Sequence, residues 1–351
     1  MNSSLATATL ATPHQRQHRV RPLPTPAALR EALPLTPELT ADIDRHRAAI
    51  RAILDGRDSR LLVITGPCSL HDTDSALEYG QRLAELAERV SDRLLLVMRA
   101  YVEKPRTTVG WKGLLHDPHL DGRGDLDSGL RLSRDLLIRL AESGLPIATE
   151  LLSPLAVPYL EDLLSWAAIG ARTTESQPHR EMVSGLTLPV GFKNGTDGEL
   201  DSARDAMRAA AHPHSRLGID LDGRPALIET SGNPHTHLVL RGGRHGPNYD
   251  AVSVRRAHDA LEQAGLNTRI VVDCSHANSG KDPARQPQVL EEIIEQRRHG
   301  DRSLVGVMLE SHLSGGNQSI NGQLQYGVSI TDACLGWADT ESALLRLARA
   351  V

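Results

Sequence analysis

The sequence predicts an α/β protein built as a (β/α)8 TIM barrel with an N-terminal extension and an inserted β-hairpin. From residue 60 onward, eight short apolar stretches alternate with segments of helical periodicity. Continuous apolar strands separated by helices indicate a parallel sheet with both faces covered. Eight such units in about 290 residues are typical of a closed barrel. A doubly wound open sheet is the alternative, but no G-x-G-x-x-G follows the first expected strand.

Each expected element has its own local signal. A polar amphipathic stretch at 36–55 predicts a helix ahead of the first strand. The buried strands are expected at 61–65, 94–98, 146–149, 167–171, 189–192, 236–240, 269–273 and 304–309. Helical periodicity between them marks 75–90, 128–143, 199–211, 251–264 and 287–298. An Asp-Gly turn between short apolar runs predicts the inserted hairpin at 214–230.

The expected organisation is an N-terminal arm and helix over 1–58, followed by the barrel over 59–351. Residues 1–30 contain no acidic residue and are rich in Ala, Thr, Pro and Arg. That composition fits an organellar transit peptide. A floppy or partner-bound arm is the preferred interpretation, because arginine is abundant throughout the chain.

Composition excludes several classes of protein. The 351 residues are 40% hydrophobic and 24% charged, as in ordinary globular proteins. A net charge of −5 gives no reason to expect a nucleic-acid partner. No apolar run is long enough for a membrane span. Three cysteines cannot form a disulfide framework, which indicates a reducing compartment, and we expect a soluble cytoplasmic protein.

Lysine is rare in a chain that otherwise uses arginine for positive charge. Of 39 basic residues only four are lysines, namely Lys104, Lys112, Lys193 and Lys281. Lysine and arginine differ in geometry and hydration. A lysine retained against this bias is therefore a candidate for a specific role.

Every expected strand has an ionisable residue at or just after its end. They are Cys68, Arg99, Glu150, Arg172, Lys193, Arg241, His276 and Glu310. A barrel places its active site at the carboxyl ends of its strands, so these side chains are expected to share one site.

Four of these residues form a predicted cation cluster: Arg99, Arg172, Lys193 and Arg241. Four buried positive charges require anions nearby. Arginine binds phosphate and carboxylate through two parallel hydrogen bonds, so the expected ligand is a small phosphorylated carboxylic acid. The alternative is that each cation pairs with a neighbouring carboxylate in a structural salt bridge.

A second set has the chemistry of metal ligands. Cys68, His276 and Glu310, with Asp332 from SITDACLGW, offer a thiol, an imidazole and two carboxylates. This set suits a first-row transition metal better than magnesium, which prefers oxygen ligands. The alternatives are a cysteine packed as a small apolar group and a histidine bonded locally.

Several long motifs give the chain a family resemblance. The motifs are GPCSLHD (66–72), MRAYVEKPRTTVGWKGLLHDP (98–118), WAAIGARTTESQ (166–177), PVGFKNGTDG (189–198), LRGG (240–243), DCSHANS (273–279), GVMLESHL (306–313) and SITDACLGW (329–337). With these motifs the chain resembles the microbial class I 3-deoxy-D-arabino-heptulosonate 7-phosphate (DAHP) synthases of the phenylalanine- or tyrosine-sensitive type over roughly residues 20–350.

The resemblance implies a role for each matched residue. It implies one divalent transition metal ion (Mn, Fe, Co or Zn), held by Cys68, His276, Glu310 and Asp332. It implies a phosphoenolpyruvate site made of Arg99, Lys104, Glu150, Arg172, Lys193 and Arg241. Binding of D-erythrose 4-phosphate falls to Arg106, Thr107 and Asp332. Catalytic roles fall to Lys104, His276 and Cys68, with Lys104 or His276 as the proton donor to the new hydroxyl.

The implied reaction is the metal-dependent condensation of phosphoenolpyruvate with D-erythrose 4-phosphate, the first step of the shikimate pathway, with release of phosphate. A homodimer or homotetramer is expected, with no nucleic acid and no membrane as partner. Lys281 lies just past DCSHANS and is expected to be a surface residue. Two rival interpretations are a 3-deoxy-octulosonate 8-phosphate synthase, against which KPRTT counts, and an inactive regulatory homologue.

Some stretches depart from the family pattern. Cys274 stands where many relatives have phenylalanine. The stretch 151–159 (LLSPLAVPY) is rich in proline, and the hairpin segment 214–230 lacks the aromatic residue expected there. These departures fall where family members bind a feedback amino acid, so weak or absent inhibition by phenylalanine or tyrosine is expected.

Overall fold

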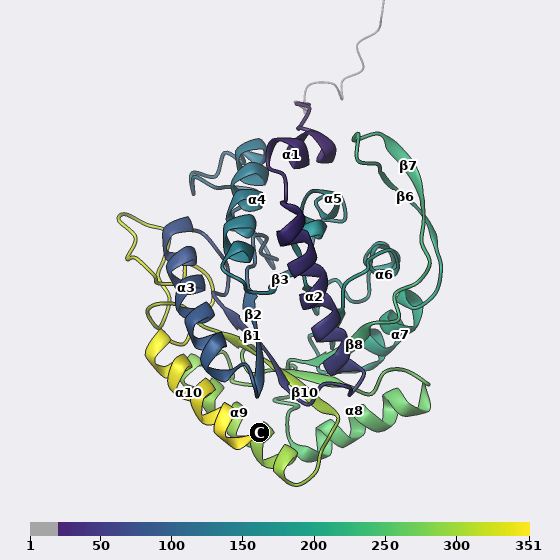
Figure 1. Ribbon diagram of the computed structural model, residues 1–351, viewed down its shortest axis with the longest axis vertical. Helices are drawn as coiled ribbons and strands as arrows, with labels where there is room; N and C mark the ends of the chain where they lie inside the picture. Colours follow the sequence, from purple (N-terminus) through teal and green to yellow (C-terminus); the bar gives the residue numbers. More distant parts are fainter. Residues whose placement is uncertain (1–19) are drawn as a thin grey trace, which may run out of the picture.

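Eight parallel strands close into a barrel, which confirms the predicted fold class (Figure 1). The computed structural model describes residues 20–351. Around the barrel the strands follow the order β1-β10-β9-β8-β5-β4-β3-β2. Their bounds are β1 (Leu61–Gly66), β2 (Leu94–Arg99), β3 (Ile147–Glu150), β4 (Trp166–Ile169), β5 (Val190–Lys193), β8 (Thr236–Leu240), β9 (Ile270–Asp273) and β10 (Leu304–Glu310). The strand expected at 167–171 instead ends at Ile169, because Gly170 begins a turn in which its carbonyl accepts from Thr173 and Thr174.

Helices surround the strands (Figure 1). They are α3 (Thr73–Val90), α4 (Leu126–Glu142), α5 (Val157–Leu160), α6 (Gln177–Ser184), α7 (Asp201–Ala210), α8 (Ala251–Gln263), α9 (Gln286–Arg298) and α10 (Trp337–Ala350), with short 3-10 turns at η2 (Glu161–Leu163) and η3 (Pro283–Arg285). Aspartates 72, 125 and 250 accept hydrogen bonds from the first turns of α3, α4 and α8, as good N-cap residues do. Helices α5, α6 and α10 are additions to the predicted set. Among the described residues, no helix combines the length and apolarity that crossing a membrane would require.

The barrel interior is a closed apolar core. Its side chains come from alternate strand positions, including Leu62, Ile64, Val97, Ala148, Trp166, Ala168, Val239, Val271 and Met308. Helix α2 (Pro37–Leu54), predicted at 36–55, packs Ile50, Ile53 and Leu54 into the same cluster and closes one end of the barrel. The other end is left for polar side chains. Because strand residues alternate between two faces, the inward row that contains Val97, Val271 and Met308 continues to Arg99, Asp273 and Glu310.

The hairpin predicted at 214–230 is present as an antiparallel pair, β6 (Ser215–Ile219) and β7 (Pro225–Glu229). Its turn meets a short helix, α1 (Pro26–Ala32), where the Ala27 amide donates to the Leu221 carbonyl at 2.8 Å. The hydroxyl of Tyr159 donates to the carbonyl of Pro24 at 2.8 Å. The floppy-arm expectation, made for residues 1–30, is therefore wrong for residues 24–30. The rest of that expectation and the transit-peptide alternative fall mainly on 1–19, outside the described residues.

Candidate active site

A cavity of about 270 Å³ lies at the carboxyl ends of the strands. Its lining includes nine of the twelve predicted site residues: Lys104, Arg106, Thr107, Glu150, Arg172, Lys193, Arg241, His276 and Asp332. The other three, Cys68, Arg99 and Glu310, are buried and bonded to one another or to the lining. The strand-end residues therefore meet in one place, as a barrel requires.

Two members of the cation cluster are buried and paired with carboxylates. The Arg99 guanidinium donates to Glu310 at 2.9 Å and lies 3.5 Å from the centre of the Tyr101 ring. Lys193 donates to Asp273 at 2.9 Å. Burial by itself would lower the pKa of both cations, but the facing negative groups raise the pKa of each above its usual value. For these two residues the salt-bridge alternative describes the structure.

The other two members differ from the prediction of buried cations. Arg172 is exposed and Arg241 is half-buried, so that prediction is wrong for both. Arg172 donates to the Thr107 hydroxyl at 3.1 Å, and Arg241 donates to the Gly242 carbonyl at 3.4 Å. Within residues 20–351 neither guanidinium pairs with a carboxylate. The cavity therefore holds two arginines with spare donors for an anion.

The thiol and two carboxylates of the metal-ligand set lie together. Ligand atoms of Cys68, Glu310 and Asp332 are all within 4.8 Å of one another, and the Cys68 sulfur is 3.7 Å from Asp332 Oδ2. Burial, reinforced by the charge of Glu310, raises the pKa of the Cys68 thiol to about 11. Burial also opposes ionisation of Asp332, but Lys104, His276 and Lys281 lower its pKa to about 2.

His276 lies at the edge of this group. Its Nε2 is 3.9 Å from Glu310 Oε1, and it is not part of the three-residue cluster. Its Nδ1 is 2.9 Å from Asp273 Oδ2, and its backbone has a φ of 55°, an uncommon value for a residue with a side chain. A thiol, two carboxylates and an imidazole nitrogen on one wall have the donor chemistry for a transition metal. The residues present therefore fit such an ion.

Glu150 reaches the cavity because Gly170 leaves room for it. A Cβ atom at Gly170 would lie 2.2 Å from Glu150 Oε1, well inside any allowed contact. Glu150 itself is 8% exposed and lines the cavity. The glycine of the WAAIG segment is thus explained by the close approach of this carboxylate.

Two residues of the site, Lys281 and Asp273, were not predicted from the sequence as site residues. Lys281, expected only on the surface, is exposed but lines the cavity, and its backbone amide donates to the His276 carbonyl at 2.7 Å. The rarity of lysine was the available signal for it. Asp273 is completely buried and pairs with both Lys193 and His276. An aspartate at the end of an apolar strand gives no sign of partners 80 residues away in the chain.

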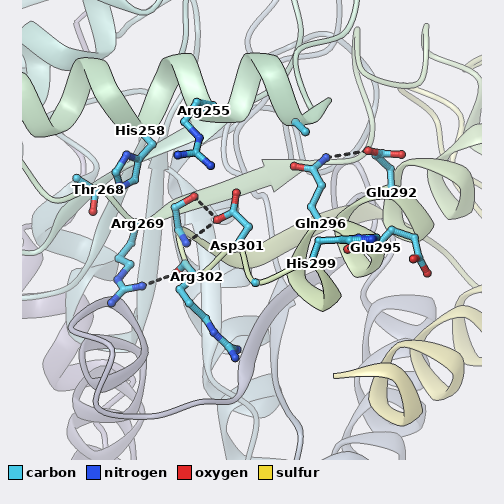
Figure 2. Close-up of a pocket in the computed structure, with 13 residues that line it drawn as sticks. Arg255, His258, Thr268, Arg269, Glu292, Glu295, Gln296, His299, Asp301 and Arg302 are labelled. Atoms are coloured by element: carbon cyan, nitrogen blue, oxygen red, sulfur yellow. Dashed lines mark hydrogen bonds between the residues drawn. The ribbon is translucent and has the colours of Figure 1, made fainter.

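A larger cavity of about 690 Å³ lies elsewhere, between α8 and α9 and beside 300–303. Figure 2 shows Arg255 and His258 projecting toward it from α8, with Gln296 and Asp301 on the opposite side. Its walls contain none of the predicted site residues. Thr268, Arg269 and Ser303 place it beside the beginnings of β9 and β10, away from the strand ends that hold the ionisable set.

Comparison with known proteins gives a consistent result. The family model described as "DAHP synthetase I family" matches residues 36–345. The tyrosine-sensitive phospho-2-dehydro-3-deoxyheptonate aldolase of Escherichia coli is 55% identical over 327 residues, which cover 92% of this chain and 91% of that protein. The phenylalanine-inhibited aldolase of Saccharomyces cerevisiae is 48% identical and covers 94% and 91%. A solved aldolase structure from Francisella tularensis has a TM-score of 0.93 at 43% identity and covers 95% of this chain and 98% of that one.

Proposed function

The chain belongs to the DAHP synthetase I family, and on that premise we propose how its site condenses phosphoenolpyruvate with D-erythrose 4-phosphate. The products are 3-deoxy-D-arabino-heptulosonate 7-phosphate and inorganic phosphate. The observation that carries the proposal is the convergence of nine family-matched residues on one cavity, with a thiol and two carboxylates at its edge. Convergence of charged groups at the carboxyl ends of barrel strands is the arrangement that barrel enzymes use for catalysis.

Phosphoenolpyruvate is held by the cations around the cavity. Arg172 and Arg241 have guanidinium donors without carboxylate partners among the described residues, and they bind its phosphate and carboxylate. Lys193 and Lys104 supply point charges at the cavity wall. Arg99 does not line the cavity, because its buried guanidinium pairs with Glu310, and it contributes its charge from beneath the cavity wall. Glu150 lines the cavity beside these cations.

Cys68, His276, Glu310 and Asp332 hold one divalent transition metal ion, with Mn, Fe, Co or Zn as candidates. The close approach of the thiol and the two carboxylates supports this, because a bound divalent cation would offset their negative charge. When bound, the ion supplies Lewis-acid polarisation of the aldehyde oxygen of erythrose 4-phosphate. A geometry in which three ligand atoms already cluster favours this position.

Erythrose 4-phosphate enters past the exposed loop that carries Arg106 and Thr107. Arg106 lines the cavity and is exposed, and its guanidinium group suits the terminal phosphate of the sugar. Thr107 receives a hydrogen bond from Arg172, so the two substrate regions touch at this pair. Asp332 faces the cavity from the opposite loop.

The condensation forms a bond between C3 of phosphoenolpyruvate and the aldehyde carbon. Positive charge then develops at C2, water adds there, and the hemiketal phosphate expels inorganic phosphate. The arginines and lysines of the cavity wall hold the two substrates face to face and stabilise their negative charge. They therefore contribute to the rate through proximity and electrostatics.

Lys104 is the better candidate for the proton that the new hydroxyl requires. Neighbouring negative groups raise its pKa, so it is an ammonium group, and it lines the cavity. The alternative donor, His276, has its Nδ1 engaged with Asp273 and Ser275. Its other nitrogen, Nε2, faces the metal-ligand set, so neither nitrogen is placed to deliver a proton to the substrate.

The chain forms a homodimer or homotetramer. The cross-strand pair Leu217 and Leu227 on the hairpin supports association, because these side chains are 82% and 71% exposed. Light scattering of the purified protein measures the assembly, and a monomer at working concentration would contradict it.

Sugar specificity separates this function from its nearest rival. Purified protein should consume phosphoenolpyruvate with erythrose 4-phosphate and not with arabinose 5-phosphate. Turnover only with arabinose 5-phosphate would identify a 3-deoxy-octulosonate 8-phosphate synthase. No turnover with either sugar and any divalent metal would support an inactive regulatory homologue.

A further inference from the structure

One carboxylate oxygen of Asp273 contacts both Lys193, from the proposed phosphoenolpyruvate site, and His276, from the proposed metal-ligand set. Its Oδ2 accepts from Lys193 Nζ at 2.9 Å and lies 2.9 Å from His276 Nδ1. Its Oδ1 accepts from the Ser275 amide at 3.0 Å and from the Ser275 hydroxyl at 2.6 Å. The side chain is completely buried, so all these contacts form away from water.

These contacts fix which nitrogen of His276 carries the proton. The Ser275 hydroxyl has one hydrogen, which it donates to Asp273 Oδ1. Its 2.8 Å contact with His276 Nδ1 therefore requires the nitrogen to donate. Asp273 Oδ2 accepts from Lys193 and lies 2.9 Å from the same nitrogen, so the carboxylate is placed to accept from Nδ1 as well. The lone pair is thus on Nε2, the nitrogen that faces Glu310.

We infer that Asp273 is a positioning residue that couples metal binding at His276 to phosphoenolpyruvate binding at Lys193, an inference that rests on the proposed function. An anionic substrate drawn to Lys193 weakens the hold of that ammonium on Asp273. The carboxylate then interacts more strongly with His276 Nδ1–H, which makes Nε2 a better electron donor. Each ligand therefore strengthens the binding of the other, and by thermodynamic linkage both enhancements are equal.

A purely structural role for Asp273 predicts something different. The backbone of this loop has its own anchor, since the Asn278 amide group donates to the carbonyls of Asp273 and Leu240 at 2.9 and 3.1 Å. If Asp273 only braced the loop, its loss would weaken both ligands independently. The coupling between them would then survive.

The test measures binding, with no turnover required. Calorimetry gives the dissociation constant of Mn²⁺ with and without phosphoenolpyruvate, and of phosphoenolpyruvate with and without Mn²⁺. For each ligand, the ratio is its dissociation constant without the other ligand divided by its dissociation constant with it. In the wild type the two ratios should agree and lie above about 5. Asp273→Asn should weaken Mn²⁺ by about 10–100-fold, as loss of an orienting partner does, and bring the ratio close to 1.

Two further variants separate coupling from damage. Ser275→Ala removes a contact to His276 and none to Lys193, so it should weaken Mn²⁺ but keep the ratio. Lys193→Gln should weaken phosphoenolpyruvate and bring the ratio close to 1, while Mn²⁺ alone binds as tightly as in the wild type or more tightly. If Asp273→Asn fails to fold, Lys193→Gln decides the question.

The possible failures are distinct. A wild type that binds neither ligand overturns the proposed function itself. A wild type that binds both with a ratio of 1 overturns the coupling. An undiminished ratio in Asp273→Asn or in Lys193→Gln also overturns it.

Discussion

The ammonium of Lys104 lies 2.7 Å from the sulfur of Cys68 and 3.4 Å from a carboxylate oxygen of Asp332. The residue proposed to donate a proton is therefore in contact with two proposed metal ligands. Lys104 and Cys68 are buried, which strengthens the electrostatic interaction between them, whereas the Asp332 side chain is 42% exposed. Metal binding and proton transfer are expected to depend on the same small group of atoms.

Replacing Cys68 with alanine should remove the only sulfur donor proposed for the metal. We expect the affinity for Mn²⁺ or Zn²⁺ to fall by at least about 100-fold, more than the loss of an outer partner costs. Cys68→Ser should keep a weaker, harder donor. Metal titration monitored by calorimetry checks both variants.

Cys274→Ala is the matched control for this experiment. Cys274 is equally buried, and its sulfur points to the Val272 carbonyl at 3.8 Å, outside the donor set. Its affinity for metal should equal that of the wild type. Full turnover of Cys68→Ala after chelation would rule out the proposed ligand.

Arg106→Ala should act mainly on the sugar phosphate. Loss of one charge-assisted hydrogen bond costs about 1.5–3 kcal/mol, so the KM for erythrose 4-phosphate should rise by about 10–100-fold. The KM for phosphoenolpyruvate should change little. Steady-state kinetics with each substrate varied measures the difference, and Arg123→Ala, at an exposed arginine outside the cavity, is the control. Equal losses for both substrates would contradict the assigned role.

Feedback inhibition should be weak or absent. The relatives include enzymes named for sensitivity to tyrosine or phenylalanine. The proline-rich segment after β3 contacts the N-terminal segment, where Arg30 donates to the Pro158 carbonyl at 2.9 Å. Turnover measured during titration with phenylalanine, tyrosine and tryptophan should stay nearly constant. Strong inhibition by any one of them would disprove the expectation.

His237 should make stability depend on pH. It is completely buried inside the barrel, accepts from the Trp166 indole at 3.2 Å, and burial lowers its pKa from 6.5 to about 3. The unfolded state binds a proton near pH 6.5 and the folded state does not. This contribution to stability is therefore complete above pH 6.5 and is lost as the pH falls toward 3, by up to about 1.4 kcal/mol per pH unit.

Denaturant unfolding at several pH values tests this dependence. His237→Gln keeps an acceptor for the indole and cannot titrate, so the slope of unfolding free energy against pH should become shallower. His245→Gln, at an exposed histidine, should leave the slope unchanged. An unchanged slope in His237→Gln would show that another group dominates.

The barrel was predictable because its strands are short, apolar and regularly spaced. The ends of those strands then located Arg99, Glu150, Lys193 and Glu310 without structural information, since each is the last residue of its strand. Helix α6 was harder to predict, because it is only eight residues long and its sequence QPHREMVS carries a weak apolar pattern.

The partners of each charge could not be predicted. Arg99 ends β2 and Arg172 follows β4, but Arg99 is buried against Glu310 whereas Arg172 is exposed beside Thr107. Pairings such as Lys193 with Asp273 join residues far apart in the chain, and only closure of the barrel brings them together. The family motifs named the residues, whereas the ion pairs depend on the three-dimensional arrangement.

The most direct test follows phosphoenolpyruvate consumption and phosphate release by the purified protein, with and without erythrose 4-phosphate and with and without a chelator. Both signals should require the sugar phosphate, disappear with the chelator and return when a divalent transition metal is added in excess. Consumption that persists in the chelated protein would contradict the metal site. No consumption with both substrates and any of the four metals would contradict the enzyme function itself.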